Sequence, residues 1–135
     1  MKKFLVRKTA TSPVEVVEVS TSDDMWAAWK NILDNATIER IALFVNGITL
    51  ALWVDENGLL RRLPPNLATP GATLVGPVIV SSYRTRNGHT QTMNKKEEEA
   101  AQALFAGTAN VEWPKPFIPE GATVFTFGFK EGGLV

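Results

Sequence analysis

The chain has 135 residues, the size of one domain that can bury a hydrophobic core without crosslinks. It contains no cysteine, which excludes disulfides and thiolate chemistry. Its 14 Lys and Arg residues balance 14 Asp and Glu residues, which disfavours both a general nucleic-acid binder and an acidic DNA mimic. No stretch is typical of a signal peptide or a membrane span, so we expect a cytoplasmic protein.

The first expected elements are a hairpin and a helix. Lys3 to Lys8 and Pro13 to Val19 are rich in strand formers and are separated by a turn. A helix from Asp23 to Asp34 follows, since Thr21 or Ser22 can cap it. Its apolar residues recur at helical spacing, and we interpret them as a core face rather than a ligand platform; they are Met25, Trp26, Trp29, Ile32 and Leu33.

A second hairpin is predicted from Ile38 to Val54. Asn46-Gly47 separates two apolar runs, which is typical of a two-residue type I′ turn. Such a turn pairs Leu43 with Leu50 and Ile41 with Leu52. Both faces of the hairpin are apolar, so we expect both to be at least partly covered.

Two further strands are predicted after this hairpin. Leu59 to Leu63 follows the turn at Asp55 to Gly58 and is expected to be an edge strand, because Arg61 and Arg62 interrupt it. Pro64-Pro65 should end it. Leu74 to Tyr83 reads as one strand, in which Gly76-Pro77 indicates a bulge or an edge position.

These motifs carry a family resemblance. The turn Asp55 to Gly58, the segment Leu63-Pro64-Pro65-Asn66 and the strand at Val75-Gly76-Pro77 resemble a family of phages, plasmids and conjugative elements, domain of unknown function 3846. The likeness covers about half of the chain, from the first helix to about Phe105, and the tail after Gly107 falls outside it. It implies a mobile-element origin and therefore a place of action in the host cytoplasm. It implies no activity, because none is established for the family.

The last expected elements are a helix and an extended arm. Asn94 and Glu97 form a capping-box pattern before a helix from Lys95 to Phe105, and Gly107 can end it. Residues 107–135 then form a possible C-terminal arm with a last strand at Ala122 to Phe129. We therefore expect one α+β domain over residues 1–135, with a mainly antiparallel sheet of about six strands packed by two short helices.

No catalytic, metal or cofactor motif is found. His89 is the only histidine, and neither a Gly-x-Ser-x-Gly elbow nor a Gly-rich phosphate loop is present. Glu97, Glu98 and Glu99 fall on different faces of a first helical turn, which suits the helix dipole better than a metal. We expect no enzyme, no cofactor and no metal site.

Two binding functions remain. The first is a small phage-type regulator that binds a host protein, for instance RNA polymerase, and modulates it, most simply by inhibition. The Pro-rich segment with Trp113 and Phe117 could be a partner-binding arm, and Arg84 and Arg86 could contribute to it. The competing interpretations are an arm that packs as core and arginines on a solvated strand end.

The alternative is a protein that sequesters a nucleotide signal of host defence. Its candidate residues could assemble a phosphate pocket, at an oligomer interface; they are Arg61, Arg62, Tyr83, Arg84 and Arg86. The sequence does not choose between the two functions, and it does not give the oligomeric state.

Overall fold

The computed structural model describes residues 1–113 of the chain. This part contains ten strands and two helices. In chain order they are β1 (Lys2–Arg7), β2 (Glu15–Val19), α1 (Ser22–Ile32), β3 (Ile38–Val45), β4 (Ile48–Asp55), β5 (Pro65–Thr69), β6 (Ala72–Val75), β7 (Val78–Ser82), β8 (Thr85–Arg86), β9 (His89–Thr90), α2 (Lys95–Ala106) and β10 (Val111–Glu112).

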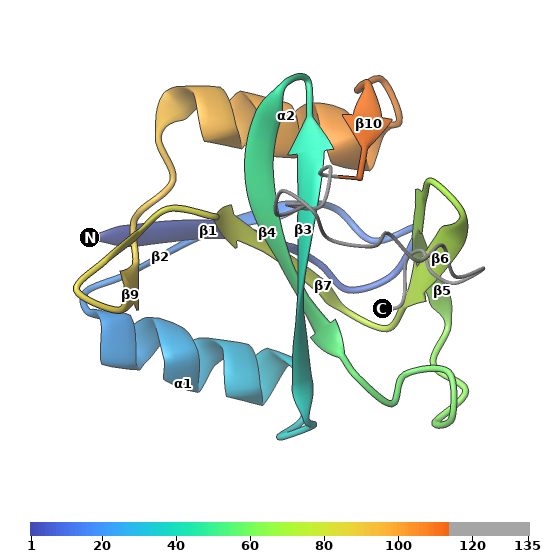
Figure 1. Cartoon of the computed structure of the whole chain (residues 1–135). Coiled ribbons are helices and arrows are strands. Elements are labelled where there is room, and N and C mark those ends of the chain that lie inside the picture. Colours follow the sequence, from blue (N-terminus) through green and yellow to red (C-terminus); the bar gives the residue numbers. More distant parts are fainter. Residues whose placement is uncertain (114–135) are drawn as a thin grey trace, which may run out of the picture.

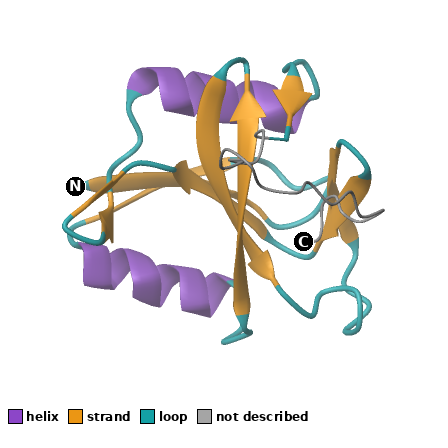
Figure 2. Cartoon of the chain, in the orientation of Figure 1, coloured by secondary structure: helices purple, strands orange, loops and turns teal. Residues whose placement is uncertain are grey.

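Six of these strands form one sheet in the order β10-β3-β4-β7-β1-β2, and every neighbouring pair is antiparallel. The other four form two small ribbons, β5-β6 and β8-β9. Figure 2 shows the two helices beside this sheet. The predicted α+β fold, with a six-stranded antiparallel sheet and two short helices, is therefore confirmed.

The helices cover opposite faces of the sheet, with α2 above it and α1 below it in Figure 1. Each face has its own hydrophobic core. The α2 side buries Ala100, Ala101, Leu104 and Phe105 against Leu5, Leu43, Leu50, Leu52 and Val80. The α1 side buries Met25, Trp29 and Leu33 against Phe4, Val6 and Ile79. The expectation that both faces of the second hairpin are covered is confirmed.

Most local predictions are confirmed as well. The first hairpin is β1-β2, and in β3-β4 Leu43 pairs with Leu50 as expected. Thr21 caps α1 by accepting the Asp24 N–H. The α2 capping box is complete, with Asn94 and Glu97 each bonded to the other's backbone N–H.

The predicted edge strand from Leu59 to Leu63 is wrong, because these residues form a turn. The N–H of Arg61 donates to the Asn57 carbonyl at 2.9 Å, and that of Leu63 donates to the Gly58 carbonyl at 3.0 Å. The buried Asp55 carboxylate accepts from the Asn57 N–H and from Arg61. These local bonds satisfy the backbone and leave it no ladder to join.

The single strand predicted from Leu74 to Tyr83 is also wrong, because Gly76 divides it into β6 and β7. Gly76 has a φ of 76°, a left-handed conformation that ends β6. Pro65 begins β5 rather than ending a strand, which is the position where a missing N–H is tolerated. The expected last strand, Ala122 to Phe129, lies outside the described residues.

Two of the three motifs of the family resemblance, those that contain Asn66 and Gly76, meet at one buried junction. The Asn66 amide donates to the Gly76 carbonyl at 2.9 Å and to the Arg7 carbonyl at 2.6 Å. Arg7 in turn donates two hydrogen bonds to Asn66, from Nε to the side-chain Oδ1 and from Nη2 to the backbone carbonyl. Desolvation lowers the pKa of Arg7. These motif residues therefore hold the β5-β6 ribbon to β1.

Candidate interaction surface

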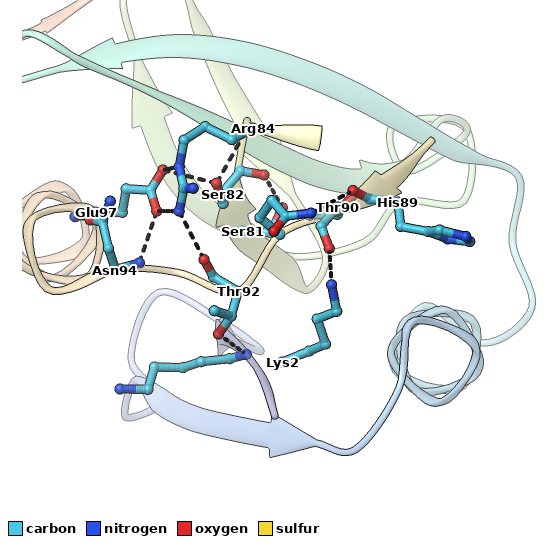
Figure 3. Close-up of polar contacts among 11 residues, drawn as sticks. Lys2, Ser81, Ser82, Arg84, His89, Thr90, Thr92, Asn94 and Glu97 are labelled. Carbon is cyan, nitrogen blue, oxygen red and sulfur yellow. Dashed lines mark hydrogen bonds and ion pairs between the residues drawn. The ribbon is translucent and has the colours of Figure 1, made fainter. Parts of the chain in front are cut away.

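Arg84, a candidate in both predicted functions, is held by Glu97. Its Nε and Nη2 atoms donate to the two carboxylate oxygens at 3.0 and 2.8 Å, and Nη2 also donates to the Thr92 carbonyl (Figure 3). The Ser82 hydroxyl donates to the same carboxylate at 2.8 Å. The hydrogen bond to Glu97 raises the pKa of Arg84. Arg84 thus links the end of β7 to the start of α2.

Arg61 and Arg62 lie far from Arg84. Arg61 pairs with Asp55 at the end of β4 and with Asp34 after α1. Arg84 follows Ser82, which pairs with Leu50 near the start of β4. At the rise of an extended strand, the two anchor points are about 16 Å apart. One chain therefore does not assemble the phosphate pocket predicted for the nucleotide alternative.

Tyr83 contacts an arginine that sequence reasoning missed. The Arg40 guanidinium lies 4.2 Å from the centroid of the Tyr83 ring and 5.7 Å from that of Trp53. Tyr83 is 40% exposed. Arg40 comes from β3, so only the strand register brings these side chains together, and no local motif in the sequence could have indicated it.

Arg86 and His89 lie on the exposed β8-β9 hairpin. The Lys2 ammonium donates to the Thr90 carbonyl at 2.9 Å and ties this hairpin to β1. The His89 side chain extends toward α1, on the opposite side from Arg84 and Glu97 (Figure 3). The hairpin therefore stands over the N-terminal end of α1.

Trp113, the first aromatic residue of the predicted C-terminal arm, is packed onto the domain. Its indole Nε1 donates to the Pro70 carbonyl at 2.6 Å, and its ring is half-buried against the α2-side core. This contact favours the interpretation of Trp113 as part of the core. Phe117 lies outside the described residues.

Within residues 1–113, the most exposed large apolar residues belong to the turn that replaced the predicted edge strand. We call Asn57–Leu63 the leucine turn, because it presents Leu59 at 76% and Leu60 at 84% exposure. Several contacts fix its backbone. Besides its internal bonds, the Glu56 N–H donates to the Thr37 carbonyl at 2.8 Å, and Gly58 packs directly against Val75. The leucine turn therefore carries two exposed leucines on an ordered support.

A second exposed apolar feature surrounds Trp26, which is 47% exposed. We call Trp26, Trp29 and Trp53 the tryptophan corner. The Trp26 ring is steeply inclined to both others, at 68° to Trp29 and 78° to Trp53, with centroids 6.2 and 6.5 Å away. The corner borders an open cavity of about 320 Å³, whose other lining residues are Ser22, Asp23, Met25, Gly88, His89 and Thr90.

In residues 1–113, no three His, Asp or Glu side chains gather so that they could hold a metal ion. The same part of the chain has no helix long and apolar enough to cross a membrane.

No family model matches the chain, and no curated protein or solved structure is significantly similar to it. The family resemblance drawn from the motifs stays a prediction.

Proposed function

We propose that this chain is a non-enzymatic regulatory protein that binds a host protein and modulates it, most simply by inhibition. The observation that carries the proposal is the exposure of Leu59 and Leu60 on the ordered leucine turn. Adjacent leucines at such exposure are unfavourable in water and become favourable when a partner covers them. The mobile-element origin implied by the motifs makes a host protein the partner, and RNA polymerase is one target class.

The energetics of the leucine turn suit an interface anchor. Fully burying one leucine side chain contributes about 2 kcal/mol, so two leucines can supply a substantial part of a micromolar affinity. The turn is already held by the hydrogen bonds of Arg61 and Leu63, so binding orders little additional chain. Arg62 is exposed beside the leucines and can meet an acidic rim on the partner.

The test is a comparison between the wild type and the double variant Leu59→Ser, Leu60→Ser. Both proteins are tagged and used to capture partners from host lysate, and both proteins and nucleotides in the eluates are measured by mass spectrometry. We expect one host protein in stoichiometric amount with the wild type. With the purified partner, the double variant should bind at least about tenfold more weakly, as is usual for loss of an interface anchor.

The matched control is Val16→Ser, which removes an exposed apolar side chain from β2, outside the leucine turn. It should leave the affinity unchanged, and all variants should keep the wild-type melting temperature. Equal capture of the partner by the double variant would contradict the role of the leucine turn. A bound nucleotide without any protein partner would favour the sequestering alternative.

A further inference from the structure

The cavity at the tryptophan corner has the geometry of a ligand site. Two walls are ring systems at steep angles to each other, and a third side is the β8-β9 hairpin with His89. Its volume of about 320 Å³ reaches the lower end of the range for small-molecule pockets. The cavity is separate from the leucine turn, so it does not depend on the proposed function.

The charges around the cavity select the class of ligand. Asp23 is the one lining residue with a full negative charge, and neither lysine nor arginine lines this cavity. The faces of indole rings are also negative, because their π electrons form a quadrupole. Asp23 therefore supplies the negative charge beside this cavity, against the positive N-terminal end of α1, which begins at Ser22.

The same ring cluster already contacts a cation elsewhere. The Arg40 guanidinium lies 5.7 Å from the Trp53 centroid, within the distance at which a ring attracts a positive charge. Arg40 does not line the cavity, although it lies over Trp53, one of the rings that does. Trp26 is the member of the corner that is most open to an incoming ligand.

We propose that the tryptophan corner binds a methylated ammonium group. Such a group is bulky, apolar on its surface and positively charged, and steeply inclined aromatic rings with a nearby carboxylate recognise all three properties. Trp26, the exposed ring of the corner, supplies the main ring contact, and Asp23 supplies the counter-charge. The group can belong to a free choline-like solute or to a trimethylated lysine of a protein.

The experiment follows the four indole N–H signals of the full chain by NMR during titration with choline chloride. Signals of Trp26, Trp29 and Trp53 should shift saturably, whereas the Trp113 indole, bonded to Pro70 on the other core, is an internal control and should not. The uncharged isostere 3,3-dimethylbutan-1-ol should bind at least about tenfold more weakly, because it lacks the cation–π attraction. Sodium chloride keeps the ionic strength constant.

Two pairs of variants separate the contribution of the Trp26 ring from that of the Asp23 charge. Trp26→Phe keeps an aromatic ring and should retain most of the affinity, whereas Trp26→Leu keeps only apolar contact and should lose about tenfold. Asp23→Asn should weaken choline binding, and Asp24→Asn, the neighbouring carboxylate outside the cavity lining, should not. The half-exposed position of Trp26 makes both ring variants compatible with folding, which the dispersion of the spectrum verifies.

A trimethyllysine peptide and its unmethylated form distinguish the two sources of the group. Tighter binding of the methylated peptide than of choline assigns the site to a protein side chain, and the reverse order assigns it to a free solute. Equal binding of choline and the uncharged isostere would overturn the proposal, since the cavity would then be merely apolar. Absence of a saturable shift, or an equal shift of Trp113, would overturn it as well.

Discussion

Glu97 is only 3% exposed, yet its carboxylate accepts four hydrogen bonds. Burial by itself raises the pKa of Glu97, but the hydrogen bonds from Arg84, the Asn94 N–H and the Ser82 hydroxyl outweigh burial and lower it. The residue closes the first turn of α2 and connects this helix to the end of β7. Its role is structural, although Arg84 and its neighbours resemble an anion site in the sequence.

We expect Glu97→Gln to lower the free energy of unfolding by about 2 kcal/mol, because charged hydrogen bonds are replaced and one acceptor oxygen becomes a donor. Urea denaturation at pH 7 measures the change. Glu99→Gln removes the same charge from an exposed position in the same helical turn and should change the stability by less than about 0.5 kcal/mol. Equal effects of the two substitutions would contradict a specific role for the buried carboxylate.

The stability difference between wild type and Glu97→Gln should depend on pH. Because the folded protein lowers the pKa of Glu97 from its ordinary value of 4.5, the unfolded chain binds the proton more readily. The stabilisation by Glu97 is therefore fully present above pH 4.5 and is lost as the pH falls through the lowered pKa of Glu97 in the folded protein. Denaturation curves between neutral and strongly acidic pH should converge for the two proteins; a constant gap would be inconsistent with this linkage.

Among the elements, the β5-β6 ribbon and the leucine turn depend on Gly76. A Cβ atom at this position would lie 2.7 Å from Cδ1 and 3.4 Å from Cβ of Leu63, the last residue of the leucine turn. Gly76 also needs its left-handed φ of 76°. The glycine therefore serves two purposes, the left-handed backbone conformation that ends β6 and the close approach of the leucine turn.

Gly71 allows these two purposes to be separated. It has a φ of 79°, but a Cβ atom there would meet nothing within 4 Å. Gly71→Ala should cost only the conformational term, about 1 kcal/mol, whereas Gly76→Ala should cost about 1 kcal/mol more because Leu63 must move. Thermal or urea denaturation compares the two. Equal losses would show that Leu63 adapts freely and that the leucine turn is not positioned by Gly76.

On the scale of the whole molecule, local sequence signals predicted the elements well. The Asn46-Gly47 turn, the Thr21 cap and the Asn94 capping box each act over a few residues, and all are found. The edge strand failed because the Asp55 carboxylate organises the turn that follows it, through hydrogen bonds from Asn57 and Arg61 that a pattern of apolar residues does not reveal. Strand propensity was overridden by this one buried group.

The binding surfaces were harder to predict than the fold. Arg84 and Arg61 looked available, but each pairs with a buried carboxylate, Glu97 and Asp55, whose burial the sequence pattern did not indicate. The tryptophan corner brings together side chains of α1 and Trp53 of β4. Arg40 of β3 contacts Tyr83, which follows β7, although β4 lies between these two strands in the sheet. Such clusters depend on sheet order, which the sequence did not supply.

The six-stranded sheet separates two cores, and we expect them to unfold together because they share its strands. Leu43→Ala on the α2 side and Ile79→Ala on the α1 side should each lower the stability by about 3 kcal/mol. Tryptophan fluorescence, which reports mainly the α1 side, and far-ultraviolet circular dichroism should give coincident urea transitions. An earlier fluorescence transition in Ile79→Ala alone would instead indicate that α1 and its core unfold separately.

The position of β1 inside the sheet has a consequence for how the chain reaches its native state. β1 pairs with β7 through Leu5 and Val80, so most of the polypeptide lies between the two partners. The hairpins β1-β2 and β3-β4 can form early on a ribosome, but the sheet closes only after β7 has emerged. Closing so long a loop is entropically costly, and folds dominated by such contacts acquire their structure slowly. Until that step, the apolar edges of β1 and β4 are open, and the nascent protein is at its most vulnerable to aggregation.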